Sequence, residues 1–311
     1  MRASWLRQVV VLLAVLALVA AACGEDEPTV EPGAPTGPTE ETATGPTGET
    51  ETGDDLLAKI QEDGVIRVST DGADPPQSEL NEETGGYEGF DIDVATEIAN
   101  RLGVRVEWTE PAWEAITAGH WNDRWDMSVG SMTVTPERTE VLHFTPAYYF
   151  SPASIAVHED NTTITDLAND LDGKTIGVCG GCTYDFYLQG TLEIPGYEFN
   201  FVVDDPRIVT YDTDTTAIQD LALGDGARLD AVMSALPTLE RAINRGRPIK
   251  IVGDPLFGEP LAVAIDRSSS LDPTSLVDRV SQIIEEMHAD GTLTELSMKW
   301  YGTDLSEEPS I

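Results

Sequence analysis

Strand-like and helix-like segments alternate along the chain from Gly64 onwards, and this alternation restricts the possible folds more than any other feature. The run 64–69 alternates partly apolar and polar residues as a strand does. The run 90–102 places its apolar residues on one helix face and ends at Gly103. The same reasoning predicts strands at 104–108, 125–130, 174–178, 208–211 and 229–233, and helices at 112–119, 183–188 and 215–223. Such βα units predict an α/β fold with a mainly parallel sheet.

The predicted segments form two similar sets, separated by an extended run at 148–157. Two further extended runs, 250–252 and 260–265, follow the second set, and two helices over 276–287 and 292–300 close the chain. We therefore predict two lobes joined by a double hinge, with the last helices returning to the first lobe. Because ligands of open α/β folds bind beyond the carboxyl ends of the strands, facing lobes form a cleft there.

The N-terminus predicts export. Arg2 and Arg7 flank the start of an apolar stretch at 9–19, and Ala20-Ala-Ala-Cys23 places small residues before a cysteine. This pattern resembles a bacterial lipoprotein signal, which implies removal of residues 1–22 and lipidation of Cys23. An ordinary secretory peptide cut at Ala22 is the alternative, and it also exports the protein.

Residues 23–55 are rich in Gly, Pro, Thr and Glu and have no periodic apolar positions, so we expect a disordered acidic tether. The remaining chain is long enough for one large domain or two smaller ones. The net charge of −38 argues against nucleic acid as a partner, because nucleic-acid binding needs a basic surface.

The stretch 129–138 supplies groups that suit a small carboxylate. Ser131 and Thr133 stand on alternate residues at the end of a predicted strand, and Arg138 follows the Thr135-Pro136 turn. The hydroxyls donate hydrogen bonds to the carboxylate from one side. The planar guanidinium donates two parallel hydrogen bonds to it from the other side. A strand, a turn and a surface arginine form the alternative interpretation.

From about 62 to 304, the chain resembles the solute-binding family 3, the amino-acid-binding proteins of ABC importers. Seven stretches carry the resemblance in order: 64–68, 89–94, 130–138, 144–149, 172–178, 226–232 and 289–293. The resemblance implies a two-lobe periplasmic-binding-protein-like fold of type II, with a double-strand hinge and a ligand cleft between the lobes. It also implies the first lobe at 56–154 and 258–311 and the second at 155–257.

In this family the residue that matches Arg138 binds the ligand carboxylate. The residues that match Ser131 and Thr133 bind that carboxylate or the neighbouring amine. Trp113 matches a wall of the pocket, although a buried core tryptophan is the alternative. Asp71 matches a loop position that touches the ligand side chain, although an aspartate of a plain turn is equally compatible.

In the second lobe, the run 178–183 matches a Gly-rich turn ending in a hydroxyl residue at a helix start. Free backbone N–H groups and the Thr183 hydroxyl suit an anion, and a simple N-cap is the other interpretation. Cys179 and Cys182 form a Cys-x-x-Cys pattern that also occurs in thioredoxin-like redox sites. For an exported chain we favour a structural disulfide, and we expect neither a metal nor a cofactor.

One position departs from the family pattern. Many amino-acid binders place an aspartate that pairs with the ligand α-ammonium where this chain has Ala235. Either the ligand lacks this ammonium, or another carboxylate binds it, with Asp214 and Glu259 as candidates. An ammonium buried without a partner is costly. For each candidate taken singly, solvated surface is the competing interpretation.

The leading hypothesis is a monomeric receptor, anchored by its lipid outside the cytoplasm, that closes over a small carboxylate-bearing solute and presents it to an ABC permease. An amino acid is the preferred solute, and no catalytic residue is assigned. The same fold resembles cyclohexadienyl or arogenate dehydratases, so an enzyme is one alternative. A ligand-sensing component of a signalling system is another.

Overall fold

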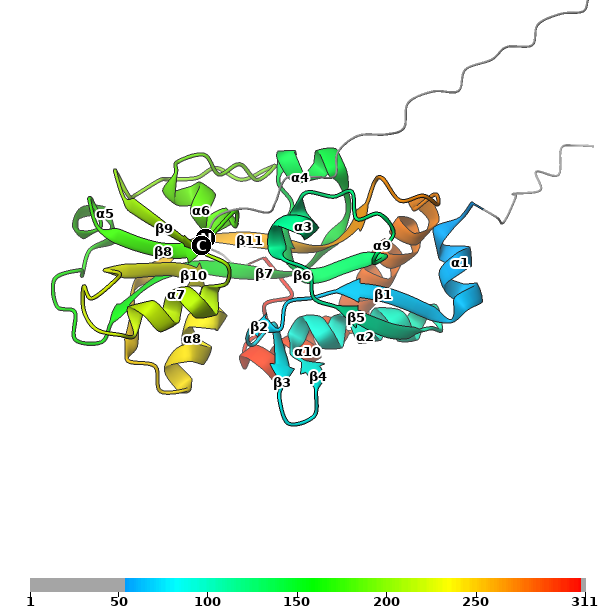
Figure 1. Ribbon diagram of the computed structural model, residues 1–311, viewed down its shortest axis with the longest axis horizontal. Coiled ribbons are helices and arrows are strands. Elements are labelled where there is room, and N and C mark those ends of the chain that lie inside the picture. The colour runs from blue at the N-terminus through cyan, green and yellow to red at the C-terminus, as the bar shows by residue number, and fades with distance from the viewer. Residues whose placement is uncertain (1–53, 309–311) are drawn as a thin grey trace, which may run out of the picture. The chain divides into compact units, whose positions relative to one another are not determined.

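The computed structural model describes residues 54–308 of the chain (Figure 1). The predicted signal peptide, Cys23 and nearly all of the predicted tether lie outside these residues. Asp55, the last tether residue, caps helix α1 (Leu56–Asp63) by accepting a hydrogen bond from the Ala58 amide at 2.7 Å. No helix among the described residues has the length and apolar character needed to cross a bilayer.

Each lobe is built on three parallel strands, and two long strands run through both lobes. In the first lobe these strands are β1 (Val65–Ser69), β5 (Arg105–Thr109) and β6 (Met127–Thr133). In the second they are β8 (Thr175–Cys179), β9 (Arg207–Tyr211) and β10 (Ala231–Ala235). The prediction of a two-lobe α/β fold is confirmed.

The long strands β7 (Leu142–His158) and β11 (Ile249–Asp266) form the double connection between the lobes. They pair antiparallel with each other, while β11 also pairs with β6 and β7 with β10. The sheet is therefore mixed, and the prediction of a mainly parallel sheet holds only within each lobe. The runs 250–252 and 260–265 are not separate strands but parts of β11, which accommodates them through shifts of register.

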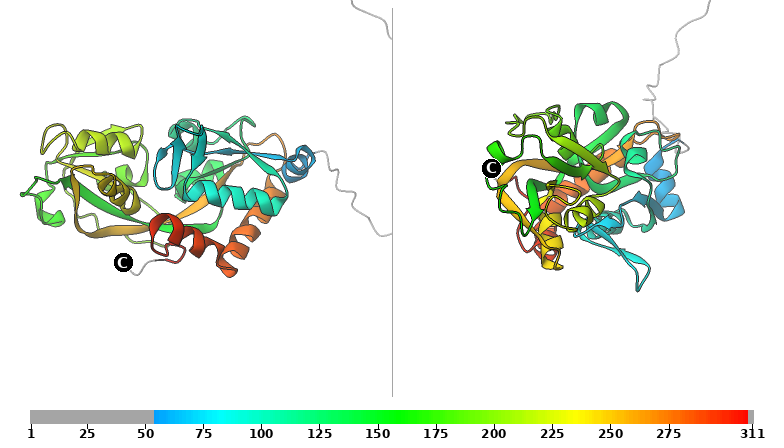
Figure 2. Two further views of the ribbon diagram at one scale, coloured as in Figure 1. Left: turned by 90° about the horizontal axis from the view of Figure 1, so that it is seen from below. Right: turned by 60° about the vertical axis from the view of Figure 1, so that its left-hand side comes forward.

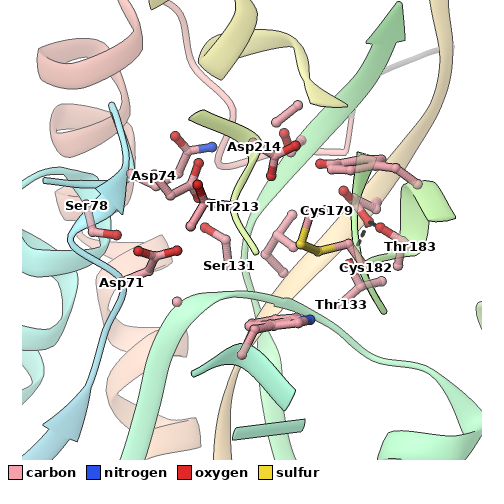
Figure 3. A pocket seen from close by; sticks show the side chains of 18 of the residues that line it. Asp71, Asp74, Ser78, Ser131, Thr133, Cys179, Cys182, Thr183, Thr213 and Asp214 are labelled. Atoms are coloured by element: carbon pink, nitrogen blue, oxygen red, sulfur yellow. Dashed lines mark hydrogen bonds between the residues drawn. A yellow bond between two sulfur atoms is a disulfide. The ribbon is translucent and has the colours of Figure 1, made fainter. Parts of the chain in front are cut away.

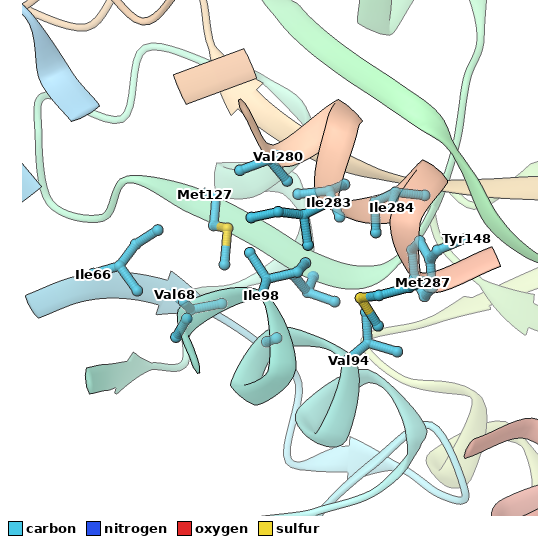
Figure 4. Close-up of a cluster of buried hydrophobic side chains, with 14 of the residues drawn as sticks. Ile66, Val68, Val94, Ile98, Met127, Tyr148, Val280, Ile283, Ile284 and Met287 are labelled. Atoms are coloured by element: carbon cyan, nitrogen blue, oxygen red, sulfur yellow. The ribbon is translucent and has the colours of Figure 1, made fainter. Parts of the chain in front are cut away.

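The core of the first lobe includes residues from near both ends of the described chain, Leu56 and Leu305. Helix α2 (Phe90–Leu102) packs against α9 (Thr274–Ala289) and α10 (Thr292–Tyr301), as Figure 2 shows. Figure 4 shows the part of this core that lies between α2 and α9. Ile98 of α2 and Ile283 of α9 are fully buried in this cluster. Burying each such side chain stabilises the fold by about 1.5–3 kcal/mol. The last two helices thus share a buried cluster with α2 and the strands of the first lobe.

Helix α2 begins where the backbone passes very close to another segment. Gly89 has φ +142°, and a Cβ atom there would lie 2.2 Å from the carbonyl oxygen of Gln77. Only glycine combines this conformation with this approach. Gly103, at φ +77°, ends the helix in a left-handed conformation, as the sequence predicts.

The second lobe contains helices α5 (Leu167–Asp170), α6 (Thr183–Leu188), α7 (Asp214–Leu221) and α8 (Leu236–Asn244). Their apolar residues form two clusters with the strands of that lobe. Helix α8 was not predicted from the sequence, although Pro237 in its first turn is a typical helix-start residue.

Other short elements were also missed. After β1, the short strand β2 (Ala73–Asp74) forms a small sheet with β3 (Ser78–Asn81) and β4 (Gly86–Glu88). Helix α4 (Pro136–Val141) was not predicted, and α3 (Trp113–Thr117) is shorter than expected. Strands of two to four residues are too short to display a recognisable alternation.

Candidate functional site

A cavity of about 70 Å³ lies between the lobes, beyond the carboxyl ends of the parallel strands (Figure 3). Its lining comes from the segments that end or follow β1, β6, β8, β9 and β10, and from the long strands. This is the position that open α/β folds use for ligands. All eight ligand-binding candidates from the sequence line it: Asp71, Trp113, Ser131, Thr133, Arg138, Thr183, Asp214 and Glu259.

The side chain of Arg138 reaches from the first lobe to the second. Thr135 caps α4, with Pro136 in the first turn, and this local structure places Arg138 beside the cavity. Its Nη1 donates to the carbonyl oxygen of Thr133 at 2.9 Å, and its Nη2 donates to that of Gly181 at 3.1 Å. Arg138 is only 4% exposed, so the surface-arginine interpretation is wrong.

The charge of Arg138 is poorly compensated. Burial lowers its pKa to about 10, and the charge of Glu259 offsets this effect only in part. Both hydrogen-bond acceptors of the guanidinium among the described residues are neutral carbonyl groups. A buried cation with neutral partners favours an anionic ligand, because a carboxylate accepts charge-assisted hydrogen bonds and supplies the missing countercharge.

Glu259 bridges the hydroxyls of the two lobes. Its Oε2 accepts from Thr133 Oγ1 and from Thr183 Oγ1, each at 2.6 Å. Glu259 is 2% exposed, so its interpretation as solvated surface is wrong. Thr183 is not the N-cap of α6 either, since Cys182 holds that position. The hydroxyls assigned to a ligand carboxylate thus hold a carboxylate of the protein in this structure.

Ser131 belongs to a buried hydrogen-bond network beneath the cavity. Its hydroxyl donates to Asp91 Oδ2 at 2.8 Å and lies 2.7 Å from the Tyr149 hydroxyl, while Tyr148 donates to Asp91 Oδ1 at 2.8 Å. Burial raises the pKa of Asp91 to about 7, although these hydrogen bonds oppose the rise. Asp91 was not among the predicted site residues, but it lies in the stretch 89–94 that carries the family resemblance.

Three aspartates gather at another part of the cavity. Asp71 accepts a hydrogen bond from the Ala73 amide at 2.7 Å, as an aspartate in a turn does, and it also lines the cavity. The turn interpretation and the cavity interpretation of Asp71 are therefore compatible. Asp214 opens α7, and its Oδ1 is buried without a hydrogen-bond partner among the described residues. Burial raises the pKa of Asp214 to about 7. Burial and the neighbouring carboxylates raise the pKa of Asp74.

The turn between β8 and α6 meets the first lobe through Gly181. The carbonyl oxygen of Gly181 accepts from Arg138 and from Trp113 Nε1, the latter at 3.4 Å. The indole ring of Trp113 also lies 5.2 Å from the guanidinium carbon of Arg138. Trp113 is thus a wall of the cavity that also packs in part against a small core cluster. Cys179 and Cys182 form the expected disulfide in this turn.

Contacts between the small β2–β4 sheet and the second lobe hold the lobes together. Glu79 of β3 pairs with Arg245, the C-cap of α8, through two contacts of 2.5 and 2.6 Å. Gln77 Nε2 donates to Thr238 Oγ1 at 3.1 Å. The structure is therefore a closed form. No local sequence pattern predicts these pairs, because their members lie far apart along the chain.

Two α/β lobes that close over a polar cavity, with a buried guanidinium reaching across it, define a two-lobed solute-binding protein. The family model for bacterial extracellular solute-binding proteins, family 3, matches residues 66–303. The chain belongs to this family, as the resemblance in the sequence predicts, and its role is that of a substrate-binding receptor.

Known proteins resemble the chain over most of its length. The L-cystine-binding protein TcyJ of Escherichia coli is 29% identical over 81% of this chain and 88% of its own. A mutant of ArgBP from T. maritima is 25% identical, with a TM-score of 0.67 over 79% of this chain and 99% of that one. An ancestral amino acid-binding protein, a precursor of cyclohexadienyl dehydratase, is 27% identical, with a TM-score of 0.65 over 79% and 99%.

Proposed function

We propose that the receptor binds an amino acid, with the ligand carboxylate against Arg138. The observation that carries this proposal is the buried guanidinium, which faces both lobes and has only neutral acceptors among the described residues. Relatives that bind L-cystine and L-arginine support the choice of an amino acid. Thr133 and Thr183 each have one hydroxyl proton, which they donate to Glu259, so the bound carboxylate accepts from them by displacing Glu259.

The ligand ammonium binds Asp214 in this proposal. Ala235, at the end of β10, lines the cavity but offers no carboxylate. The Oδ1 of Asp214 is buried and has no described partner, and an ammonium supplies one. Glu259 is the second carboxylate within the same cavity. Trp113 and Asp71 contact the remainder of the solute.

Binding and delivery follow from lobe closure. Arg138, from the first lobe, and Thr183, from the second, contact the same solute, so the bound solute favours the closed form over the open form. We expect the closed monomer to deliver its solute to an ABC permease. The family is extracellular. The lipid anchor at Cys23, the tether and the lobe boundaries at 154/155 and 257/258 remain predictions from the sequence.

A thermal-shift screen tests this function. Protein from residue 54 onwards, stripped of co-purified solute by unfolding, dialysis and refolding, is screened against amino acids, polyamines, betaines and organic acids. A solute that binds only the folded protein raises its melting temperature. We expect a shift with an amino acid, and a much smaller one with Arg138→Met. Shifts only with solutes that lack a carboxylate would contradict the proposal.

An enzyme of the same fold is the second candidate, because one structural relative is a precursor of cyclohexadienyl dehydratase. We expect no turnover, since we assign no acid or base in the cavity to such a reaction. Incubation with arogenate, followed by chromatography of the products, tests this expectation. Product formation that the purified protein sustains over many turnovers would establish the enzyme instead.

A further inference from the structure

The charges that line the cavity are strongly unbalanced. Five of the described lining residues are acidic, and one, Arg138, is basic. The acidic residues are Asp71, Asp74, Asp212, Asp214 and Glu259. In Figure 3, Asp74 and Asp214 lie at one end of the cavity, whereas Thr133 and Thr183 lie at the other end, beyond the disulfide. The cavity therefore has an acidic end in addition to its carboxylate-binding end.

The polar groups near the acidic end lack charged partners within the protein. Asp74 accepts a hydrogen bond from a neutral group, Thr238 Oγ1, at 3.3 Å. Asp214 Oδ1 has no described partner. Elsewhere in the same cavity, the hydroxyl of Ser151, which pairs in register with Glu259, is also without a described partner, although Ser151 is only 1% exposed. Unpaired buried polar groups are costly, so their presence points to a ligand that supplies the partners.

We propose that the solute carries a second cationic group besides its α-ammonium, and that Asp74 and Asp214 bind its positive charges from opposite lobes. The solute is then a basic amino acid. This inference rests on the proposed function, since the carboxylate at Arg138 fixes the orientation of the solute. An organic cation fits better than a metal ion, because no group of residues within 54–308 is arranged to hold a metal.

A solute of this charge also explains how binding drives closure. Asp71 and Asp74 follow β1 in the first lobe, and Asp214 opens α7 in the second. Burial and the charge of Asp214 raise the pKa of Asp74, while burial and the charges of Asp71 and Glu259 raise the pKa of Asp214, so carboxylates of both lobes repel one another in the closed form. A cation between the lobes removes this repulsion. A neutral side chain leaves it in place, so closure discriminates by charge.

Titration calorimetry of matched solutes tests the inference. L-Arginine is compared with L-citrulline, and L-lysine with L-norleucine, because each pair has nearly the same shape but differs by one positive charge. We expect at least one basic member to bind about a hundredfold or more tightly than its neutral partner. Asp74→Asn should reduce that ratio to about tenfold or less. Asp214→Asn should weaken both members of a pair, because both carry the α-ammonium. Asp254→Asn, at an exposed position outside the cavity, should change neither the ratio nor the affinities.

A structural role of Asp74 has a different signature. If Asp74 serves stability, Asp74→Asn lowers the melting temperature of the ligand-free protein. We expect an unchanged or raised melting temperature at pH 8, because the substitution removes a buried charge among like charges. Equal binding of the neutral and basic members, with binding of both lost in Arg138→Met, would overturn the inference but keep the proposed function. Failure of every amino acid to bind the folded protein would overturn both.

Discussion

The clearest quantitative expectation concerns Arg138→Met, which removes the guanidinium but keeps a long apolar side chain. Burial lowers the pKa of Arg138 from 12.5 to about 10. One pKa unit corresponds to about 1.4 kcal/mol, so burial disfavours the cation by about 3 kcal/mol. In the unmodified protein a bound carboxylate supplies the countercharge and recovers this free energy. Arg138→Met has no guanidinium and gains nothing from the carboxylate. We therefore expect the dissociation constant of the amino acid to rise about a hundredfold.

Titration calorimetry measures this change with the amino acid that gives the largest thermal shift. The same amino acid without its carboxylate (for L-arginine, agmatine) separates loss of the clamp from general damage to the cavity. Arg138→Met should weaken binding of the amino acid but change binding of its amine by less than about threefold. Arg247→Met, at an exposed position, is the matched control and should behave as the unmodified protein.

Two results would refute this reasoning. An unchanged dissociation constant in Arg138→Met shows that the guanidinium does not bind the solute. Equal losses for the amino acid and its amine show that Arg138 supports the cavity without contacting a carboxylate. Circular dichroism of the variant must first match that of the unmodified protein, because Arg138 also bonds the carbonyl groups of Thr133 and Gly181.

Three further predictions concern stability and closure. Burial raises the pKa of Asp91 from 3.8 to about 7, so the folded state retains a proton that the unfolded state loses, and stability falls as pH rises between these values. The fall of the unfolding free energy with rising pH, measured by urea denaturation, should be smaller in Asp91→Asn than in the unmodified protein; an unchanged fall contradicts the raised pKa of Asp91. Glu79→Gln should weaken solute binding by less than about fivefold, and by still less in high salt, because its pair with Arg245 is partly exposed; a large, salt-independent loss contradicts this. Ile283→Ala should cost about 2–5 kcal/mol in urea denaturation, because Ile283 is fully buried against α2; a loss below about 1 kcal/mol would exclude this packing.

Local patterns determined most of the architecture. The spacing of apolar residues and the glycine at 103 predicted helix 90–102 with the bounds that the structure shows. The alternation of such helices with strands predicted two α/β lobes, and two extended runs predicted the double connection. These features depend on neighbours within a few residues, so a single sequence displays them. The family resemblance added the residues that we propose bind the ligand carboxylate.

Long-range packing decided what the sequence left open. Asp214 and Glu259 were each compatible with solvated surface, and only the fold brings them into one cavity with Asp74. Thr133 and Thr183 lie on different lobes, yet both bond the same oxygen of Glu259. No local sequence pattern predicts such a contact between the lobes, because it depends on how the two lobes close against each other. The sequence by itself therefore determined the class of receptor and the residues proposed to bind a carboxylate, whereas the tertiary structure decided which charged groups meet in the cavity.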